Sequence, residues 1–486
     1  MQNIKVGQLR VLTYSHIYTF PIPEPGNVSK SANRRPDLKA ELRVVNDSFW
    51  VRLCAMGDLG FSEAYMYGDV ECDDLVSLFD MFLENREYLS NLDSRLSYLF
   101  TLPQKITSYR FLNTIGNSRS NISAHYDISN DMFAGFLSED MTYSCAIFPE
   151  LDGDLTNDKS VQSRWSGGQA LKRVAPSPLP IGDTKSADIL SHPSPESDPL
   201  YDAQMRKLQH IIDKLHIPAS TPTSAPMRVL EIGTGWGALA IRLTEQFTHV
   251  EVDTITLSSA QKALAEKRIA ARGLSGRIRV HLMDYRNMPK DWEGRFARFV
   301  SVEMIEAVGR EFLEQYWRVV DWAMEKKGAV GVVQVISIPE ARFERYIQEI
   351  DFIRKWVSFF PGGFLPTLTF LMSTLAAGSQ GRLVVETIAN IGPHYARTLR
   401  EWRRRFVARF ETVVVPSLQK EYAARTGGGK DGKPKMLGRD EIEVFRRKWL
   451  YYYCYCEVGF TTRTLGDHIL TFMREGNREY GSDVYE

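Results

Sequence analysis

The chain has 486 residues, of which 43% are hydrophobic and 25% are charged. This length exceeds what one ordinary domain needs, and the composition is typical of a soluble globular protein. Lys plus Arg and Asp plus Glu both number 60, so the formal net charge is zero. A chain without net positive charge has no long-range attraction to nucleic acid, and we expect no nucleic-acid partner.

Cysteine usage and apolar runs bear on the compartment. The five cysteines are Cys54, Cys72, Cys145, Cys454 and Cys456. An odd, unevenly spaced set without a CxxC pair predicts neither a disulfide framework nor a metal site. The first residues, MQNIKVGQLRVLTYSHIY, lack the apolar core of a signal peptide, and no run of about 18 apolar residues would cross a bilayer. We therefore expect a cytoplasmic protein that meets lipid, if at all, from the membrane surface.

The first part of the chain predicts a small α/β domain over residues 1–95. Short β-like runs at 4–14 and 38–56 (the second leading into a helix) precede DDLVSLFDMFLENREYL at 73–89, whose apolar spacing predicts a helix. Asp73 and Asp74 are its start signals. Residues 96–124 form a connector between this domain and a second one at 125–486.

The second domain contains an unusual segment at 152–200. It is rich in Ser, Pro, Asp and Gly and shows no sustained periodicity, which is typical of a disordered insertion. We assign no chemistry to it.

Strands and helices alternate regularly after this segment. Helices are expected at 203–215, 236–247, 260–273 and 310–328, and strands at 227–233, 250–258, 277–285, 297–305 and 328–338. This order predicts a doubly wound, mostly parallel sheet. Further on, we expect one or two charged helices at 395–425, an aromatic core segment at 449–460 and an antiparallel strand–turn–strand edge at 457–475.

A glycine-rich loop follows the first strand of this sheet. In VLEIGTGWGALA (229–240), Gly233, Gly235 and Gly237 stand between a strand and a helix, where doubly wound sheets bind ligands. The spacing differs from the dinucleotide fingerprint. The carboxylate of Glu231 would repel a pyrophosphate but would suit the amino group of S-adenosylmethionine (SAM). The loop is therefore interpreted as a SAM site.

The next two strands end in further candidates. Asp253 is placed to bind a ribose, as acids at this strand end do in many nucleotide folds. The alternative ligands at the same edge are Thr256, Leu257, Ser258 and Gln261. After the following strand, Asp284 or Tyr285 would meet the adenine.

Several motifs occur together in a fixed order. They are FSEAYMYGDVECDDLVSLFDMFLENR (61–86), HYDISNDMFAGFLSEDMTYSCAIF (125–148), VLEIGTGWGALA, ITLSSAQ, MDYRNM, VEMIEAVG (302–309), FFPGGFLPTL (359–368) and HYARTLREW (394–402). This set resembles the cyclopropane-fatty-acyl-phospholipid synthase family over nearly all of the chain except 152–200. The resemblance implies a Rossmann-like class I methyltransferase sheet with a small N-terminal α/β domain.

The resemblance also implies an activity. Family members transfer the SAM methyl group to a cis double bond of a phospholipid acyl chain. The resulting carbocation loses a proton with the help of bicarbonate and closes a cyclopropane ring. The implied partners are a phospholipid bilayer, met peripherally, and a second copy of the chain through the N-terminal domain.

Site residues carry over from the family by position. For bicarbonate these are the backbone at Cys145 and Ile336, the carboxylate of Glu306 and the hydroxyl of Tyr395, while Gln334 stands where bacterial members carry a histidine. For SAM the implied residues are Tyr126, Tyr143, Ser144, Glu231, Gly233, Gly235, Trp236, Gly237, Thr256, Leu257, Ser258, Gln261, Asp284, Tyr285 and Arg286.

Alternatives stay open on the product and the substrate. Because Gln334 cannot be protonated, deprotonation elsewhere would give a methyl-branched or methylene lipid. Small-molecule or sphingolipid methyltransferases, and a lipid-binding protein with an inactive methyltransferase fold, are rival interpretations. The basic, apolar segment at 402–410 is either a surface for anionic head groups or an ordinary solvated helix face.

Overall fold

The computed structural model describes residues 3–21, 38–89, 129–155, 198–219, 225–349, 351–357, 363–426 and 436–478. The predicted connector at 96–124 lies outside these ranges, as do Tyr126 and most of the segment predicted to be a disordered insertion.

The N-terminal unit is a four-stranded sheet in the order β2-β1-β3-β4, packed against helices. Its elements are β1 (Gln8–Leu12), β2 (Ile17–Phe20), β3 (Lys39–Val44), α1 (Ser48–Tyr67), β4 (Val70–Cys72), α2 (Leu75–Glu84) and α3 (Arg86–Leu89). The predicted start of the helix is confirmed, because the Asp74 carboxylate caps α2 by accepting from the backbone amides of Val76 and Ser77. Alternating burial along β1 and β3 gives the sheet one apolar face, which packs on these helices.

The larger unit is built on a seven-stranded sheet in the order β10-β11-β9-β8-β5-β6-β7. Its strands are β5 (Met227–Ile232), β6 (Val250–Thr256), β7 (Ile278–Leu282), β8 (Arg298–Val302), β9 (Val330–Ser337), β10 (Leu383–Asn390) and β11 (Gly466–Arg474). β5 to β9 run parallel, and β11 pairs antiparallel with both of its neighbours. The predicted doubly wound, mostly parallel sheet is confirmed.

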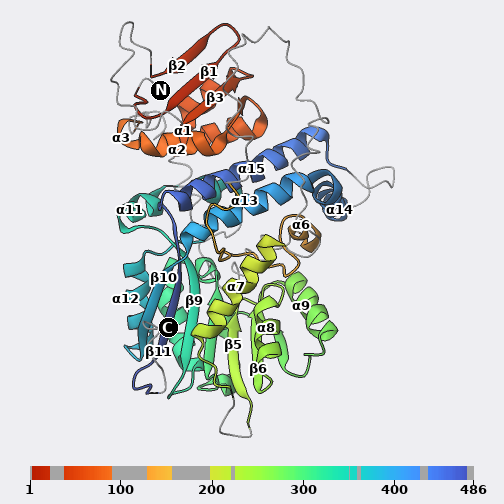
Figure 1. Cartoon of the computed structure of the whole chain (residues 1–486), viewed down its shortest axis with the longest axis vertical. Helices are drawn as coiled ribbons and strands as arrows, with labels where there is room; N and C mark the ends of the chain where they lie inside the picture. The colour runs from red at the N-terminus through yellow and green to blue at the C-terminus, as the bar shows by residue number, and fades with distance from the viewer. Residues whose placement is uncertain are drawn as a thin grey trace.

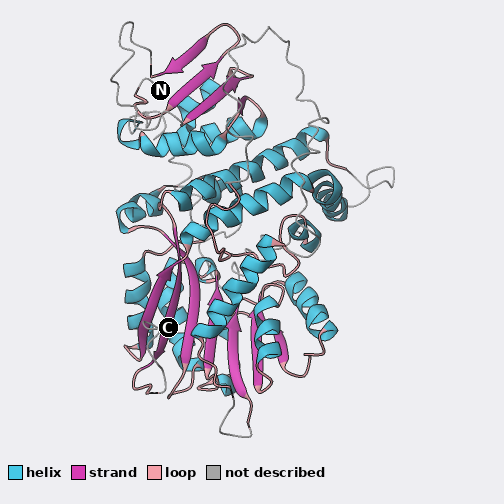
Figure 2. Ribbon diagram, in the orientation of Figure 1, coloured by secondary structure: helices cyan, strands magenta, loops and turns pink. Residues whose placement is uncertain are grey.

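Helices and short turns connect these strands (Figure 2). The longer helices are α7 (Pro199–Lys214), α8 (Ala238–Gln246), α9 (Ser259–Ala271), α10 (Leu313–Ala323), α11 (Glu340–Gln348), α12 (Leu368–Ser379), α13 (Gly392–Ala408), α14 (Val415–Thr426) and α15 (Arg439–Thr461). The short ones are α6 (Asn130–Ala134), η4 (Tyr285–Asn287), η5 (Lys290–Trp292), η6 (Ile305–Ala307), η7 (Arg310–Phe312), η8 (Ile353–Val357) and η9 (Phe410–Val414). The sequence pattern had assigned no element to α11, α12 or β10.

The prediction for the C-terminal region was right about an antiparallel strand at 466–474 and wrong about its first strand and its edge position. Residues 457–461 continue helix α15 instead of forming a strand, and β11 lies between β9 and β10 instead of at an edge. Every residue of β11 is buried, because a strand with a neighbour on each side and covered faces has no exposed row of side chains. The edge position belongs to β10, whose side chains alternate in exposure.

Helices α13 and α15 lie side by side between the N-terminal sheet and the larger sheet (Figure 1). The aromatic ring of Tyr451 on α15 lies 4.9 Å from that of Phe79 on α2 and 4.3 Å from that of Phe352. The interpretation of residues 449–460 as core is confirmed, since Trp449, Tyr451, Tyr453 and both cysteines of this segment are buried. The aromatic layer holds the two units together.

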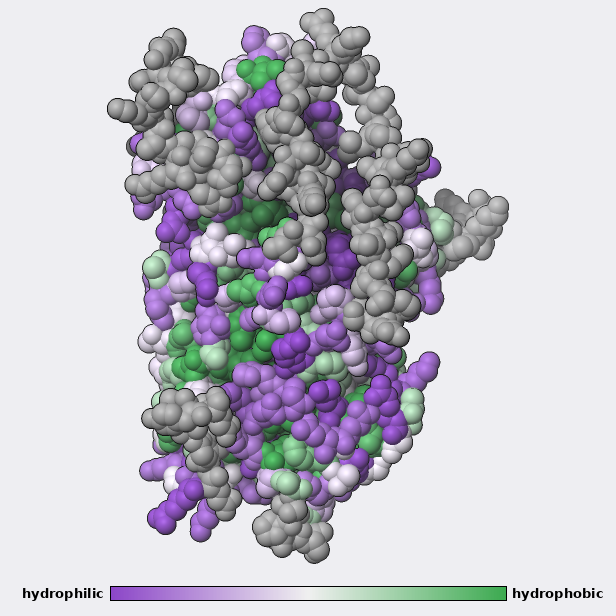
Figure 3. Space-filling view, viewed as in Figure 1, coloured by the Kyte–Doolittle hydropathy of each residue, from purple (hydrophilic) through white to green (hydrophobic). Residues whose placement is uncertain are grey.

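The molecular surface mixes hydrophilic and hydrophobic residues on the face shown in Figure 3. Within the described ranges, none of the helices combines the length and hydropathy that crossing a bilayer requires.

Most arginine side chains at 403–405, in the basic segment at 402–410, are engaged in ion pairs within the protein and are not free to meet lipid head groups. Arg403 pairs with Glu457 at 3.0 Å, and Arg405 pairs with Asp198 at the start of α7. Only Arg404 of this trio is largely exposed, with 55% of its side chain accessible. Two of the three arginines therefore tie α13 to neighbouring elements.

Candidate active site

The glycine-rich loop joins β5 to α8 at the carboxyl end of the sheet. Its three glycines have positive φ angles of 106° at Gly233, 51° at Gly235 and 85° at Gly237, a region that other L-residues rarely adopt. A side chain at Gly233 would also approach Cβ of Met304 to 3.2 Å, whereas Gly235 faces open space. The loop thus brings its backbone to the edge of a cavity, as the sequence predicted.

The cavity collects most of the residues predicted for SAM. Its lining includes Tyr143, Ser144, Glu231, Gly233, Gly235, Trp236, Thr256, Leu257, Gln261, Asp284, Tyr285 and Arg286. Two predicted residues do not line the cavity. Gly237 directly precedes α8, and the Ser258 hydroxyl accepts the backbone amide of Gln261 at the start of α9. Tyr126 lies outside the described residues.

Glu231 is the most unusual acid of this wall. It is 3% exposed, and its Oε2 atom has no hydrogen-bond partner among the described residues. Burial raises the pKa of Glu231 to about 8. A buried carboxylate oxygen without a partner is costly, and the ammonium group of a ligand would satisfy it. The residues present here therefore fit SAM.

Neighbouring contacts fix the rest of the wall. The Thr256 hydroxyl donates to Oε1 of Gln261 at 2.8 Å, and the Arg286 guanidinium pairs with Asp284 at 2.6 Å. From α6, Asn130 accepts the indole N–H of Trp236 at 2.8 Å. The segment at 129–148 is thus joined to the glycine loop.

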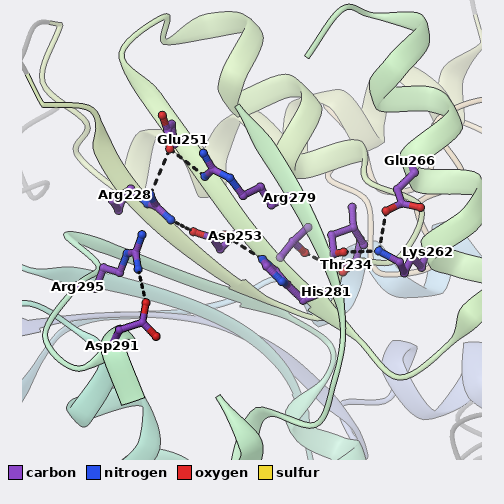
Figure 4. Close-up of polar contacts among 12 residues, drawn as sticks. Arg228, Thr234, Glu251, Asp253, Lys262, Glu266, Arg279, His281, Asp291 and Arg295 are labelled. Carbon is purple, nitrogen blue, oxygen red and sulfur yellow. Dashed lines mark hydrogen bonds and ion pairs between the residues drawn. The ribbon is translucent and has the colours of Figure 1, made fainter. Parts of the chain in front are cut away.

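The ribose role suggested for Asp253 is wrong. Asp253 lies in the middle of β6, before the strand end at Thr256, and it does not line the cavity. Its carboxylate pairs with Arg228, and its other oxygen meets Nε2 of His281 at 2.9 Å (Figure 4). These partners hold the pKa of Asp253 below its usual value despite burial. The alternative residues at the end of this strand line the cavity instead.

A second group of residues meets the cavity from the other side. It consists of three acids, Glu303 after β8, Glu306 in η6 and Asp467 in β11, which are called the carboxylate cluster below. Glu303 alone of these three lines the cavity. Sequence reasoning found Glu306 but missed Glu303 and Asp467.

Glu303 is the hub of the cluster. Its Oε1 accepts from the backbone amide of Cys145 at 2.8 Å and from Nε2 of Gln334 at 2.7 Å. Its Oε2 accepts from the hydroxyl of Tyr395 at 2.6 Å. Three of the five residues predicted to be catalytic are therefore brought together, and each of them donates to one carboxylate.

The other two acids are deeper. Glu306 is 3% exposed; its Oε1 accepts the backbone amide of Ile336, and its Oε2 has no partner among the described residues. Burial and the nearby Glu303 raise the pKa of Glu306 to about 8. Asp467 accepts from Gln334 at 2.8 Å, and burial together with Glu303 raises its pKa well above the usual range.

A buried cation completes this side. Lys207 on α7 has no solvent exposure, lines the cavity and donates to the hydroxyl of Ser144 at 2.7 Å. Burial lowers the pKa of Lys207, and Glu303 opposes that shift. The sequence showed Lys207 only as one polar residue of an amphipathic helix, although it stands next to the buried Leu208.

The Cys145 thiol is poorly suited to act as a nucleophile. Burial raises its pKa well above the usual value, and Asp467 and Glu303 raise it further. The expectation that the backbone, not the sulfur, serves the site agrees with the hydrogen bond from the Cys145 amide to Glu303.

Bicarbonate does not fit the donors that the family resemblance assigned to it. The amide of Cys145, the side chain of Gln334 and the hydroxyl of Tyr395 are all bound to Glu303, and the amide of Ile336 is bound to Glu306. An anion at this place would displace a carboxylate and stand beside its charge. The donors assigned to bicarbonate are therefore already taken by the carboxylates of Glu303 and Glu306.

Sequence comparison finds relatives over most of the chain. The family model described as mycolic acid cyclopropane synthetase matches residues 114–165 and 192–425. The tuberculostearic acid methyltransferase UfaA1 of Mycobacterium tuberculosis is 31% identical over 430 residues, covering 88% of this chain and 82% of that protein. The cyclopropane-fatty-acyl-phospholipid synthase of Escherichia coli is 28% identical over 437 residues, covering 90% and 88%.

Solved structures with the same fold are more distant in sequence. The cyclopropane synthase MmaA2 from Mycobacterium tuberculosis superimposes with a TM-score of 0.50 at 21% identity, covering 73% of this chain and 97% of that one. A coclaurine N-methyltransferase bound to N-methylheliamine and S-adenosylhomocysteine gives a TM-score of 0.55 at 16% identity, covering 86% and 99%. Both likenesses support the class I methyltransferase fold.

Proposed function

Because the chain belongs to the mycolic acid cyclopropane synthetase family of SAM-dependent lipid methyltransferases and cyclopropane synthases, we propose that it methylates the cis double bond of unsaturated phospholipid acyl chains and closes a cyclopropane ring. The observation that carries the proposal is one cavity lined both by the glycine loop with Glu231 and by Glu303. A cofactor bound in such a cavity would lie beside the carboxylate of Glu303.

The residues around the cavity would bind SAM and keep water away from the reacting atoms. SAM, when bound, supplies an electrophilic methyl group. Glu231 would pair with the amino group of SAM, and the backbone at Gly233 and Gly235 would lie against its chain. The buried walls around Trp236 and Tyr285 would exclude water, which protects the cation formed on the lipid from capture.

A methyl-branched or methylene lipid is the second candidate product. Gln334 favours it, because its amide donates to Glu303 and Asp467 but cannot take up a proton. The relative named a tuberculostearic acid methyltransferase also favours a reaction that stops at methylation. All these products share the methyl-transfer step. A methyl-branched alkene follows when the cation loses a proton from a neighbouring chain carbon, and an exocyclic methylene follows when a hydride shifts to the cationic carbon and the methyl group then loses a proton.

Two partners belong to this proposal. A phospholipid bilayer is the surface on which an acyl chain would be met, and peripheral contact suffices because the substrate is the lipid itself. A homodimer through the N-terminal unit is the assembly that the family resemblance implies. Sedimentation of the full chain with and without vesicles tests both.

The deciding experiment uses the purified full chain, SAM and vesicles of a cis-monounsaturated phospholipid, with vesicles of the saturated analogue as the control. Released acyl chains are identified by mass spectrometry and NMR. A cyclopropane ring supports the proposal. A methyl branch or an exocyclic methylene retains methyl transfer and removes ring closure. Binding of SAM without transfer to any lipid would contradict the proposal and point to a small-molecule substrate.

A further inference from the structure

The geometry points to Glu303 as the built-in base of this enzyme, in the place that the family resemblance gives to bicarbonate. Its two carboxylate oxygens receive the Cys145 amide, the Gln334 side chain and the Tyr395 hydroxyl at 2.6–2.8 Å. Those donors are the ones expected to hold the ion. The carboxylate thus has the same kind of anionic oxygen atoms on the same donors, but it is covalently part of the chain.

The backbone at Glu303 is strained in a way that serves this placement. Its φ angle is 45°, in the left-handed region that glycine enters freely and that a side chain enters at a cost in free energy. The Glu303 amide donates to the carbonyl of Gln334 at 2.8 Å, which helps to hold this conformation. The amide of Cys145, the side chain of Gln334 and the hydroxyl of Tyr395 form a ring of donors around the Glu303 carboxylate. A strained backbone at a residue held in this way indicates a functional role more than a packing role.

Access to the cavity separates Glu303 from the other two acids. Glu303 lines the cavity and is only partly buried, whereas Glu306 and Asp467 are at most 3% exposed and do not line it. Glu303 is therefore the acid of the cluster that a substrate in the cavity would touch. Asp467 is fully buried beside it, and the Gln334 side chain donates to both acids.

Burial raises the pKa of Glu303 above its usual range. The amide of Cys145, the hydroxyl of Tyr395 and the ammonium of Lys207 oppose this shift and favour the ionised carboxylate. Asp467 has a pKa raised well above its usual range. Two neighbouring buried acids share one negative charge most easily when the proton stays on the deeper one.

In the reaction that the proposed function requires, Glu303 would accept the proton that leaves before ring closure. The alkene electron pair forms a carbon–carbon bond to the methyl carbon, and the sulfur–carbon bond breaks with its electrons going to sulfur. This leaves S-adenosylhomocysteine and a carbocation on the acyl chain. A Glu303 oxygen takes a proton from the new methyl group, and the freed C–H electron pair closes the ring on the cationic carbon.

The test compares the wild-type chain with Glu303→Gly and Glu303→Gln. Glycine fits the φ angle of 45° and opens the ring of donors, whereas glutamine fills the same space without a basic oxygen. Glu401→Gln, at a buried acid that pairs with Arg404 on α13, is the control. Each protein is assayed for methylated lipid and S-adenosylhomocysteine in carbon-dioxide-free buffer and with added bicarbonate. The thermal unfolding temperature is measured under the same two conditions, at matched ionic strength.

Wild type and Glu401→Gln should show no dependence on bicarbonate in turnover or in unfolding temperature. Glu303→Gly and Glu303→Gln should lose at least about 100-fold in turnover, as removal of a general base typically does, while SAM binding stays within a few-fold. Bicarbonate should raise the unfolding temperature of Glu303→Gly and restore part of its turnover, but should do neither for Glu303→Gln.

A wild-type chain whose turnover or unfolding temperature rises with bicarbonate would overturn the inference, as would a Glu303→Gln variant with full turnover. Failure of the proposed function has a different signature. In that case the wild type makes no methylated lipid at any bicarbonate concentration, and the unfolding temperatures still decide whether Glu303 or an ion occupies the donors.

Discussion

The two sides of the cavity are built in different ways. The SAM side comes largely from residues 229–261, in which β5, its glycine loop, α8 and β6 follow one another along the chain. The carboxylate cluster and its donors come from residues as far apart as Cys145, Gln334 and Asp467. The first side depends on local backbone geometry, whereas the second exists only after the whole sheet has formed. Variants on the two sides should therefore damage different steps.

The largest effect on the SAM side is expected from Glu231→Gln. Burial raises the pKa of Glu231 to about 8, so without a ligand this carboxyl group is mostly protonated at pH 7. The ammonium of SAM would favour the ionised form and pair with its charge, which glutamine cannot provide. A hydrogen bond to a charged group contributes about 1.5–3 kcal/mol, so the Kd for SAM should rise roughly 10-fold to 150-fold. Isothermal titration calorimetry measures this change directly.

The control for this prediction is Glu251→Gln, at an acid on the same sheet that pairs with Arg228 and Arg279 outside the cavity (Figure 4). It should bind SAM like the wild type. Equal SAM affinity in wild type and Glu231→Gln would mean that the unpartnered Oε2 of Glu231 does not await the cofactor.

A smaller effect, on turnover alone, is expected from Tyr395→Phe. The variant removes the hydroxyl that donates to Glu303 at 2.6 Å and leaves the packed ring in place against Phe460. Loss of one donor to a charged group should lower kcat about 10-fold, while the Kd for SAM should not change. Steady-state kinetics with the vesicle substrate separate the two quantities.

A double-mutant cycle between Tyr395→Phe and Glu303→Gln tests whether the two residues act together. If the Tyr395 hydroxyl acts through Glu303, the Tyr395→Phe change should cost little in a chain that already carries Glu303→Gln. Full additivity of the two losses would show that Tyr395 serves another partner, and a rise in the Kd for SAM would mean that the two sides are not separable.

The same contrast explains what the sequence could predict. The glycine loop, its acid and the strand ends were found because each belongs to a contiguous pattern whose geometry is local. Glu303 stood inside the quoted VEMIEAVG motif, yet no pattern showed its positive φ or its three donors. Asp467 and Lys207 had no signal at all, because their roles depend on burial that only the folded sheet creates.

The C-terminal strand shows the same limit in the fold. Residues 466–474 were predicted as part of an edge hairpin, and they form a strand buried on all sides. Local β-propensity identified the strand, but which strands lie beside it is a property of the whole topology. The residue that this strand brings to the site, Asp467, was missed for the same reason.

The smallest effect on activity, and a clear one on stability, is expected from Glu306→Gln. Burial and the charge of Glu303 raise the pKa of Glu306 to about 8, so its carboxyl group is mostly protonated at pH 7, and glutamine resembles that form. Turnover at pH 7 should therefore fall by less than about 10-fold. A much larger loss would show that Glu306 works as an ionised group and that proton removal is shared between two acids of the cluster.

The pH dependence of stability carries the same argument further. The folded-state pKa of Glu306 lies above its unfolded value of 4.5, so the folded chain binds this proton more tightly than the unfolded chain does. The resulting stability is fully present below pH 4.5 and is lost as the pH rises towards about 8. Glu306→Gln has no proton to lose, so its free energy of unfolding should fall less than that of the wild type over this range in urea titrations.

The exposed-site control Glu266→Gln should follow the wild-type curve. Parallel curves for all three proteins would mean that Glu306 is ionised in the folded chain, and the cluster would then hold its negative charge on two acids instead of on Glu303 alone.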